Sequence, residues 1–443
     1  MSHQPSRIDA GLPPNALALA ERGRAHSLVI YAGAGLSLAE PTGLPPGVIV
    51  AERIAAQLCG AFHVLDHVDR SDLTAIADAV IAVDGGADAL RQTAARVAEF
   101  TSARPGYGHR LLALLLLEGV IDILTTNWDD CIERGGGPER VPSVVNAHDL
   151  ANVVPPSVLK IHGCATQPAS LLISTQDLTA PPQWVSDQIR SKLGSAVVVF
   201  VGIGDVAGYV RNRLEEAIGD VSDLDNVRVV GPTVVDEWAT SQWAQLAPDL
   251  AEENKIAATA DLFLEQLAGA YVHLSLAALS LALSDEPVLA EAVSSSASAI
   301  CHHDVLTVLA WARQSGVVAQ RGVSSFGSEP MTSALIALGT LAGGQITITR
   351  DRTLETSAGL FDVMVSVGTQ SASRLRREAR NRLENHLGNG APEPRFLVAG
   401  GFGWAPSGGS LPNDIIRDGG ADDVLDGPLN RSPDIIRAEE VSP

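Results

Sequence analysis

Residues 119–131, GVIDILTTNWDDC, show an apolar run that stops abruptly at a cluster of polar groups. A surface turn would favour Gly, Pro or Ser at this point, and the interior of a sheet would not place Asn127 and Asp129 together. Continuous apolar strands are typical of parallel sheets that are covered on both faces. The stretch therefore predicts a buried strand whose end carries polar side chains for a reason other than folding.

Similar apolar segments alternate with helical patterns through about the first 270 residues, which predicts an α/β fold with a Rossmann-like parallel sheet. The predicted strands lie in HSLVIYAGAGLS, VIDILTTN, SVLKIHG, AVVVFVGIG and NVRVVGP. Residues 48–104 contain Ala-rich amphipathic stretches and predict a helical insertion. A helix in TADLFLEQLAGAYVHLSL is expected to close this first domain, residues 1–270.

The rest of the chain is expected to form a helical region at 271–345 and a small α/β domain at 346–443 with an acidic, Gly/Pro-rich tail. One predicted helix carries five arginines between Arg374 and Arg382. A solvated face, or pairing with the acidic surface of a neighbouring subunit, would account for these charges. Contact with nucleic acid through this helix is the alternative.

The composition is that of a globular protein, with 46% hydrophobic and 19% charged residues. The formal net charge of −21 argues against one broad positive face for nucleic acid. The most apolar stretch, residues 111–124, is too short to span a bilayer and contains Glu118 and Asp122. The segment MSHQPSRIDAGLPP lacks the apolar centre of a secretory signal. We therefore expect no membrane contact.

The cysteines form no CxxC pair, which argues against a zinc ribbon and gives no disulfide framework. This usage favours a cytoplasmic location. The four cysteines are Cys59, Cys131, Cys164 and Cys301.

Four predicted strands end in glycine or polar residues: GAG, TTN, HG and GIGD. In an open parallel sheet, ligands bind beyond the carboxyl ends of the strands, so these four ends predict one shared rim. Each signal is weak by itself. The GAG turn is compatible with phosphate binding or with a purely steric role, and His162 alone would be a structural histidine more often than a site residue. Its place on the same rim as Asn127 favours a functional role.

Five motifs occur in an order and at intervals that resemble the sirtuin-like, NAD-consuming family: GAGLS…GLP, PGYGHRLLALL, TTNWD, LKIHG and FVGIGD. The resemblance covers about residues 16–270. It looks like the bacterial antiphage-defence branch, in which TTN[WY]D stands where protein deacylases have QNID. The resemblance implies NAD as the substrate and no metal in the reaction.

The resemblance also implies roles for single positions. Asn127 would hold a water or the nicotinamide ribose near its C1′ carbon, Asp129 would bind the nicotinamide carboxamide, and His162 would be the general base. The diphosphate, the ribose and the adenosine side would be bound by Gly33, Ala34, Gly35, Ser37, Thr126, Gly202 and Asp205. Trp128 is expected to pack inward beneath the site, and Asp130 and Glu133 are expected to cap the following helix.

Two departures separate this sequence from the deacylases. Only one cysteine lies between HG and GIG, so the zinc ribbon that helps to form an acyl-lysine binding site is missing from this interval. GLPPGVIV replaces the deacylases' GIP turn and its Phe-Arg, which alters the loop over the cofactor. A site without a peptide-binding surface favours hydrolysis of NAD over acyl transfer.

The leading hypothesis is an NAD⁺ glycohydrolase that acts as an antiphage abortive-infection effector. The alternatives are a protein deacylase, a non-catalytic subunit that senses NAD or ADP-ribose, and a nuclease in the last domain, for which no metal-binding carboxylate pattern is clear. The resemblance implies as partners a second copy of the chain, a HerA-type DNA-translocase ATPase or a small nucleotide activator. Nothing in the sequence selects between these inputs.

Overall fold

The computed structural model describes residues 12–282, apart from 138–139, 195, 205–214, 216, 220 and 222. Beyond residue 282 it describes only the short stretches 305–306, 308–309, 347–348, 353–357, 362–366, 377–383, 396–399 and 434–436. The chain divides after Ala268 into two compact units, and we describe each by itself.

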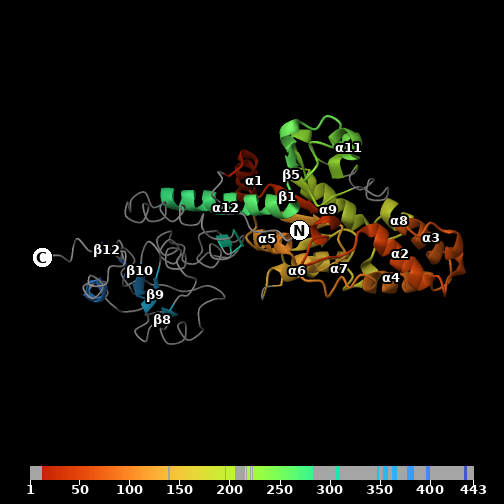
Figure 1. Cartoon of the computed structure of the whole chain (residues 1–443), viewed down its shortest axis with the longest axis horizontal. Coiled ribbons are helices and arrows are strands. Elements are labelled where there is room, and N and C mark those ends of the chain that lie inside the picture. The colour runs from red at the N-terminus through yellow and green to blue at the C-terminus, as the bar shows by residue number, and fades with distance from the viewer. Residues whose placement is uncertain are drawn as a thin grey trace. The chain divides into compact units, whose positions relative to one another are not determined.

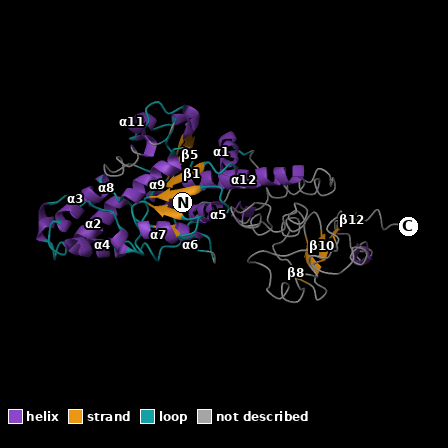
Figure 2. Ribbon diagram, turned by 180° about the vertical axis from the view of Figure 1, so that it is seen from behind, coloured by secondary structure: helices purple, strands orange, loops and turns teal. Residues whose placement is uncertain are grey.

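The first unit is built on a seven-stranded sheet in which every neighbouring pair of strands is parallel (Figures 1 and 2). The order is β3-β4-β2-β1-β5-β6-β7. All five residues of the central strand β1 are buried, as its continuous apolar sequence predicts. The strands are β1 (Leu28–Ala32), β2 (Asp122–Thr125), β3 (Ser143–Val144), β4 (Val158–Lys160), β5 (Val197–Val201), β6 (Val227–Gly231) and β7 (Lys255–Ala257). The predicted Rossmann-like α/β fold is confirmed.

Helices cover the sheet and fill the connections between its strands (Figure 2). The longer ones are α1 (Pro14–Arg24), α5 (Tyr107–Leu117), α9 (Gln183–Leu193) and α12 (Ala260–Ala282). Short helices are α6 (Cys131–Gly135), α7 (Ala147–Asn152), α8 (Thr175–Thr179) and α11 (Trp243–Leu246), with 3₁₀ turns η1 (Ala34–Ser37), η3 (Pro168–Ser170), η4 (Leu224–Asn226), η5 (Trp238–Thr240) and η6 (Glu252–Asn254). The sequence DVAGYVRNRLEEAIG, residues 205–219, predicts a further helix, and most of it lies outside the described residues.

The helical insertion forms a separate layer with its own apolar core. It contains α2 (Gly47–Leu58), η2 (His63–His67), α3 (Leu73–Ile81) and α4 (Gly86–Arg96). The Asp72 carboxylate caps α3 by accepting the N–H groups of Thr74 and Ala75. Leu171 and Ile173, from the connection between β4 and β5, are buried in the same core. The insertion is therefore joined to the loops at the end of β4.

The second unit contains a five-stranded mixed sheet in the order β12-β11-β10-β9-β8. Its strands are β8 (Thr347–Ile348), β9 (Thr353–Ser357), β10 (Asp362–Ser366), β11 (Phe396–Ala399) and β12 (Asp434–Ile436). Only β10 and β11 pair in parallel. The sequence predicts strands in GQITITR, LFDVMVSVG and RFLVAGG, and these segments contain β8, β10 and β11. The strands β9 and β12 lie outside them. The described helical residues 377–383 fall in the arginine-rich segment, and Arg374 and Arg376 lie outside the described residues.

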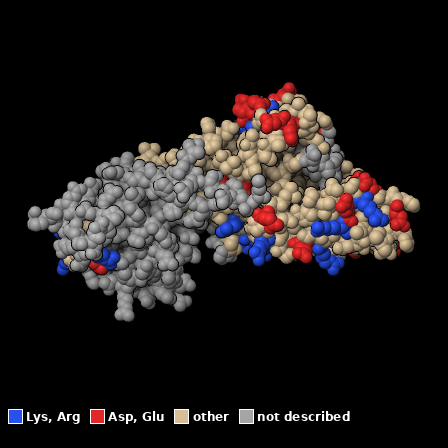
Figure 3. All heavy atoms as spheres, viewed as in Figure 1, with Lys and Arg blue, Asp and Glu red and all other residues tan. Residues whose placement is uncertain are grey.

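Charged side chains of both signs share the face of the described part that Figure 3 shows, with acidic groups gathered over the elements near α11 and basic groups along the opposite edge. Of the helices that the structure describes, none has the length and apolar character that a membrane crossing requires.

Candidate active site

The sheet register brings four of the predicted motifs to one rim, which we define as the loops that follow β1, β2, β4 and β5. Ala32 of β1 pairs with Thr125 of β2 and with Val201 of β5, and Thr125 pairs in turn with Lys160 of β4. These four strands therefore end side by side. The direction of strand order reverses at β1, where open α/β sheets bind their ligands.

The glycine loop after β1 packs against the loop after β5, backbone to backbone. The N–H of Gly33 donates to Val201 O at 2.9 Å, and the N–H of Gly35 donates to Gly202 O at 2.7 Å. A Cβ added at Gly35 would lie 2.7 Å from Gly202 O, closer than real contacts allow. The glycines therefore have the steric role that the sequence allowed, because they let the two loops approach closely. The N–H groups of Gly33 and Gly35 are both used in hydrogen bonds within the protein. The exposed Ala34 lies between them at the start of η1.

Ser37 is the centre of a buried hydrogen-bond network under this loop. Its hydroxyl donates to Asp129 Oδ2 at 2.9 Å and accepts from Asn127 Nδ2 at 3.2 Å. His109 Nε2 lies 3.1 Å from the same oxygen. Ser37 is only 2% exposed, so its hydroxyl serves three protein groups at once.

The charge of Asp129 decides the direction of every bond in this network. Burial alone would raise the pKa of Asp129, but the ammonium of Lys160, the N–H of Cys131 and the hydroxyl of Ser37 together hold it below its usual value. An ionised carboxylate only accepts hydrogen bonds, so the Ser37 proton points at Asp129. The lone pairs of Ser37 are then left for Asn127 and for His109, whose Nε2 must carry a hydrogen.

His109 was missed by sequence reasoning, although it stands in the quoted motif PGYGHRLLALL. It is the third residue of α5, and its Nδ1 accepts the N–H of Gly106, the residue before the helix, at 3.1 Å. That bond fixes the neutral tautomer with the hydrogen on Nε2. Burial lowers the pKa of His109, which agrees with a neutral ring.

Asn127 is 6% exposed and directs its two amide atoms differently. Because Nδ2 donates to Ser37, Oδ1 points elsewhere, and it has no hydrogen-bond partner among the residues that the structure describes. The main-chain N–H of Asn127 donates to Thr125 Oγ1 at 3.0 Å, which fixes the start of the loop. A buried acceptor without a partner is costly unless a ligand or water completes it.

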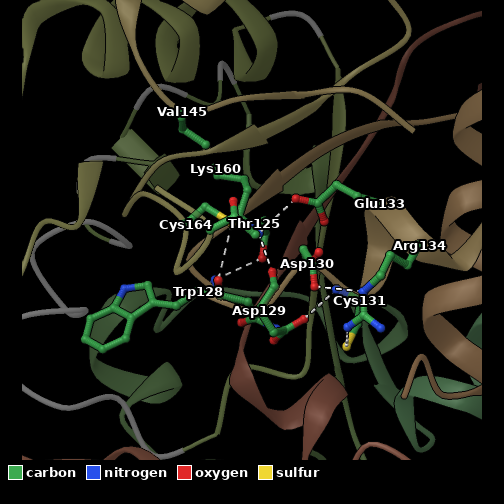
Figure 4. A network of polar contacts seen from close by, with 12 residues as sticks. Thr125, Trp128, Asp129, Asp130, Cys131, Glu133, Arg134, Val145, Lys160 and Cys164 are labelled. Carbon is green, nitrogen blue, oxygen red and sulfur yellow. Dashed lines mark hydrogen bonds and ion pairs between the residues drawn. The ribbon is translucent and has the colours of Figure 1, made fainter. Parts of the chain in front are cut away.

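The loop that carries Asn127 and Asp129 is fixed to β4 by a buried ion pair (Figure 4). Lys160 Nζ lies 3.3 Å from Glu133 Oε1 on α6 and also donates to the main-chain oxygen of Asp129. Burial, the largest single influence, would lower the pKa of the Lys160 ammonium, but Glu133, Cys164 and Asp129 together raise it. Burial also raises the pKa of Glu133.

Asp130 and Glu133 stand at the start of α6, as expected, but neither carboxylate accepts a capping hydrogen bond from the described residues. Trp128 is half-buried, so it packs inward only in part. The carboxylate of Asp130 makes no cap but binds Arg134 at 2.8 Å and also binds Arg140. The first-turn acceptor is Asp129 Oδ1, which receives the N–H of Cys131 at 3.1 Å. The half-buried Trp128 ring packs edge-on against Phe100, next to the helical insertion, with ring centroids 5.8 Å apart.

The remaining predicted residues lie on the same rim or outside the described part. His162, 4% exposed, follows β4 by two residues, as Asn127 follows the neighbouring strand β2. Thr126 extends the ladder by donating its N–H to Ala32 O at 3.2 Å. Gly202 has a positive φ of 69°, which favours glycine at this turn. Asp205 lies outside the described residues.

His109, Asp129 and Cys131 place one potential metal ligand each within 4.8 Å of one another. Their hydrogen bonds do not suit a metal ion. Both nitrogens of His109 are engaged, at Gly106 and at Ser37. Burial, followed by the Asp129 charge, raises the pKa of the Cys131 thiol, which keeps it protonated and a poor ligand.

The family profile described as SIR2-like domain matches residues 122–255. A crystal structure of a Sir2 homologue–NAD complex shares 18% identity with the chain, covers 60% of it and 96% of its own length, and gives a TM-score of 0.35. Two structures of mutant Sir2 homologues with ADP-ribose share 16% identity, cover 60% of the chain and 98% of their own length, and give TM-scores of 0.35 and 0.36. No curated protein sequence matches.

The matched residues include the TTNWD, LKIHG and FVGIGD motifs, which occupy three of the four strand ends at the rim. Residues 122–255 therefore match the profile of a SIR2-like domain, and the strand ends that carry Asn127 and His162 lie inside the matched segment.

Proposed function

We propose that this protein hydrolyses NAD⁺ at the bond between nicotinamide and ribose and releases nicotinamide and ADP-ribose. The observation that supports this most is Asn127 Oδ1, a buried acceptor at the end of β2 with no partner among the described residues. It lies at the strand end next to β1, where this fold class binds nucleotides. The SIR2-like domain makes NAD the first substrate to test.

In the proposed reaction the C1′–N bond breaks and its electron pair leaves with the nicotinamide nitrogen, which becomes neutral. The ribose carbon becomes an oxocarbenium-like centre, and an oxygen dipole fixed nearby stabilises this charge. Asn127 Oδ1 supplies that dipole and accepts a hydrogen from the attacking water or a ribose hydroxyl. His162 accepts the proton that water loses as the new C1′–O bond forms.

Asp129 is proposed to hold the nicotinamide carboxamide, as the sequence predicts. Each of its oxygens already accepts one hydrogen bond, from Ser37 and from the N–H of Cys131. A carboxylate offers about four acceptor positions, so Asp129 has the capacity to accept a further hydrogen bond. The network also keeps the Asn127 amide in one orientation, which prepares the site before the substrate arrives.

Two features favour hydrolysis over acyl transfer. The interval between LKIHG and FVGIGD has one cysteine and cannot form a four-cysteine zinc ribbon. Within that interval Leu171 and Ile173 are buried in the core of the helical insertion, so this segment packs on the protein itself. Water is then the acceptor in the proposed reaction.

We further propose that the enzyme is an antiphage effector held inactive until a partner or signal engages it. Unregulated hydrolysis of NAD would deplete the host cell. A second copy of the chain, a HerA-type ATPase and a small nucleotide are the partners to test. The arginine segment that ends at Arg382 is proposed as the one place for nucleic-acid contact.

The proposal is tested by incubating the full chain with NAD⁺, alone and with the product of a neighbouring gene, and quantifying nicotinamide and ADP-ribose. Asn127→Ala and His162→Ala are each expected to lower release at least ~100-fold. His148→Ala and Asn152→Ala, on the exposed part of α7, are matched controls. Release that requires an acetylated peptide would identify a deacylase, and NAD binding without release would identify a sensor.

A further inference from the structure

Lys160 is a charged residue at the end of a strand that is otherwise apolar, and it is buried to 1% exposure. It belongs to β4, and its register partner on β2 is Thr125, the residue from which the TTNWD loop starts. Figure 4 shows its side chain lying among the residues of that loop and of α6. The described contacts of its ammonium are the Glu133 carboxylate and the main-chain oxygen of Asp129.

Fold stability alone does not explain this arrangement. The free-energy cost of removing an ammonium and a carboxylate from water can exceed the electrostatic stabilisation from a single ion pair at 3.3 Å. Apolar side chains of similar volume at both positions would be neutral or stabilising in most proteins. The pair is therefore best explained by what Lys160 holds in place.

The held group is the backbone in the middle of the TTNWD loop. Two consecutive carbonyls there are bound by residues at and after the end of β4. The oxygen of Trp128 accepts the N–H of Ala165 at 2.8 Å, and the oxygen of Asp129 accepts from Lys160. With its carbonyl fixed, Asp129 directs its carboxylate toward Ser37 and the N–H of Cys131.

We propose that Lys160 is a positioning residue that sets the TTNWD loop through the main-chain oxygen of Asp129, with Glu133 as its buried counter-charge. Lys160 binds the main-chain oxygen of Asp129, so it acts on the loop through the backbone. Its effect reaches Asn127 through the backbone of the loop and through Ser37. The catalytic part of this inference rests on the proposed NAD hydrolysis.

The test separates positioning from charge balance by removing both charges together. Lys160→Met leaves Glu133 buried without its partner and is expected to lower the melting temperature. The double variant Lys160→Met/Glu133→Met removes both charges and is expected to melt near the wild-type temperature. Its kcat for nicotinamide release should still fall about 100-fold with KM little changed, because a displacement of ~1 Å in a catalytic group has an effect of that size.

Glu133→Gln is the matched control. It keeps the bond from Lys160 to the Asp129 oxygen but removes the counter-charge. It should therefore melt below the wild type while its kcat stays within about threefold of the wild-type value. If the double variant does not fold, Lys160→Met and Glu133→Gln are compared below their melting temperatures. Equal losses of kcat in that pair, or wild-type kcat in a stable double variant, would overturn the proposal.

Hydrogen exchange distinguishes a failure of this inference from a failure of the proposed function. A wild-type protein that releases no nicotinamide, with or without its partner, contradicts the function. The positioning role is then judged without substrate, from the protection of the main-chain amides at 126–131. Faster exchange there in the double variant, at unchanged melting temperature, supports the role of Lys160. Unchanged exchange overturns it.

Discussion

The hydroxyl of Ser37 donates to the carboxylate of Asp129 at 2.9 Å, joining two residues that are 92 positions apart. This bond links the loop after β1 to the loop after β2, and both residues are buried. It also sets the orientation of the Asn127 amide, because the other lone pairs of Ser37 must then face donors. The donor and the acceptor of each hydrogen bond in this network are therefore fixed, and the network supports the site proposed for NAD hydrolysis.

Ser37→Ala should damage both stability and activity. Asp129 would lose the hydrogen bond that it accepts from Ser37. The donors on Asn127 and His109 would lose the oxygen that both of them bind. We expect the free energy of unfolding in urea to fall by about 3 kcal/mol, the size seen when buried polar groups lose partners. Nicotinamide release should fall as well. Ser27→Ala, at an exposed hydroxyl, is the control and should stay within about 0.5 kcal/mol.

Asp129→Asn should reverse the hydrogen pattern at Ser37. An amide nitrogen facing Ser37 would leave that hydroxyl with donors on every side and no acceptor for its own proton. The folded-state pKa of Asp129 lies below 3.8, so its ionised form stabilises the fold above that pH and the effect is lost on further acidification. Urea unfolding at pH 7 should show a loss of ~2–4 kcal/mol. The gap between variant and wild type should narrow below about pH 4; a constant gap would contradict this assignment.

His109 should make the protein less stable in mild acid. Its pKa in the folded state is below the ordinary 6.5 because of burial, so the unfolded chain binds a proton that the folded chain does not. The free energy of unfolding must then fall as the pH drops below 6.5, by at most ~1.4 kcal/mol per pH unit. His109→Gln keeps a donor toward Ser37 but does not titrate, and its stability should depend less on pH. The exposed His148→Ala should keep the wild-type slope; identical slopes in all three proteins would refute the role of His109.

Gly35→Ala should separate the loops after β1 and β5. The new Cβ would meet the Gly202 backbone at 2.7–3.0 Å, and backbone atoms cannot turn aside as a side chain does. We expect a loss of about 1–3 kcal/mol in unfolding free energy, typical of overpacking, together with weaker NAD binding by calorimetry. Gly60→Ala, where the added Cβ meets nothing within 4 Å, is the matched control. Equal behaviour of the two variants would argue against the close approach of these loops.

Much of the first unit could be predicted because its strands are local patterns. The runs LVIYA and VVVFV have no charged residue and are rich in Val and Ile, a pattern typical of parallel strands that are covered on both faces. The edge strands β3 and β7, of two and three residues, were not predicted. The caps of α6 were assigned to the wrong carboxylates, since adjacent Asp129 and Asp130 are equivalent in sequence and differ only in what surrounds them.

The sequence around two supporting residues, Lys160 and His109, contains patterns that indicate their roles. A lysine inside the apolar run VLKIHG must find a buried partner, and Lys160 does so at Glu133. The spacing from Gly106 to His109 lets a side chain in the first turn return to the start of its helix. Neither local pattern identifies the distant residue that each side chain contacts, which is Glu133 for Lys160 and Ser37 for His109.

The sequence by itself determined the parallel sheet, the helical insertion and the set of polar strand ends, because hydrophobic period and glycine position act over a few residues. Only the tertiary structure decided that Ser37, His109, Asn127 and Asp129 share hydrogens, and that Gly33 and Gly35 serve the contact between two loops. Bonds across 72 to 92 positions depend on strand order and side-chain direction. Those are properties of the folded sheet, and no local pattern encodes them.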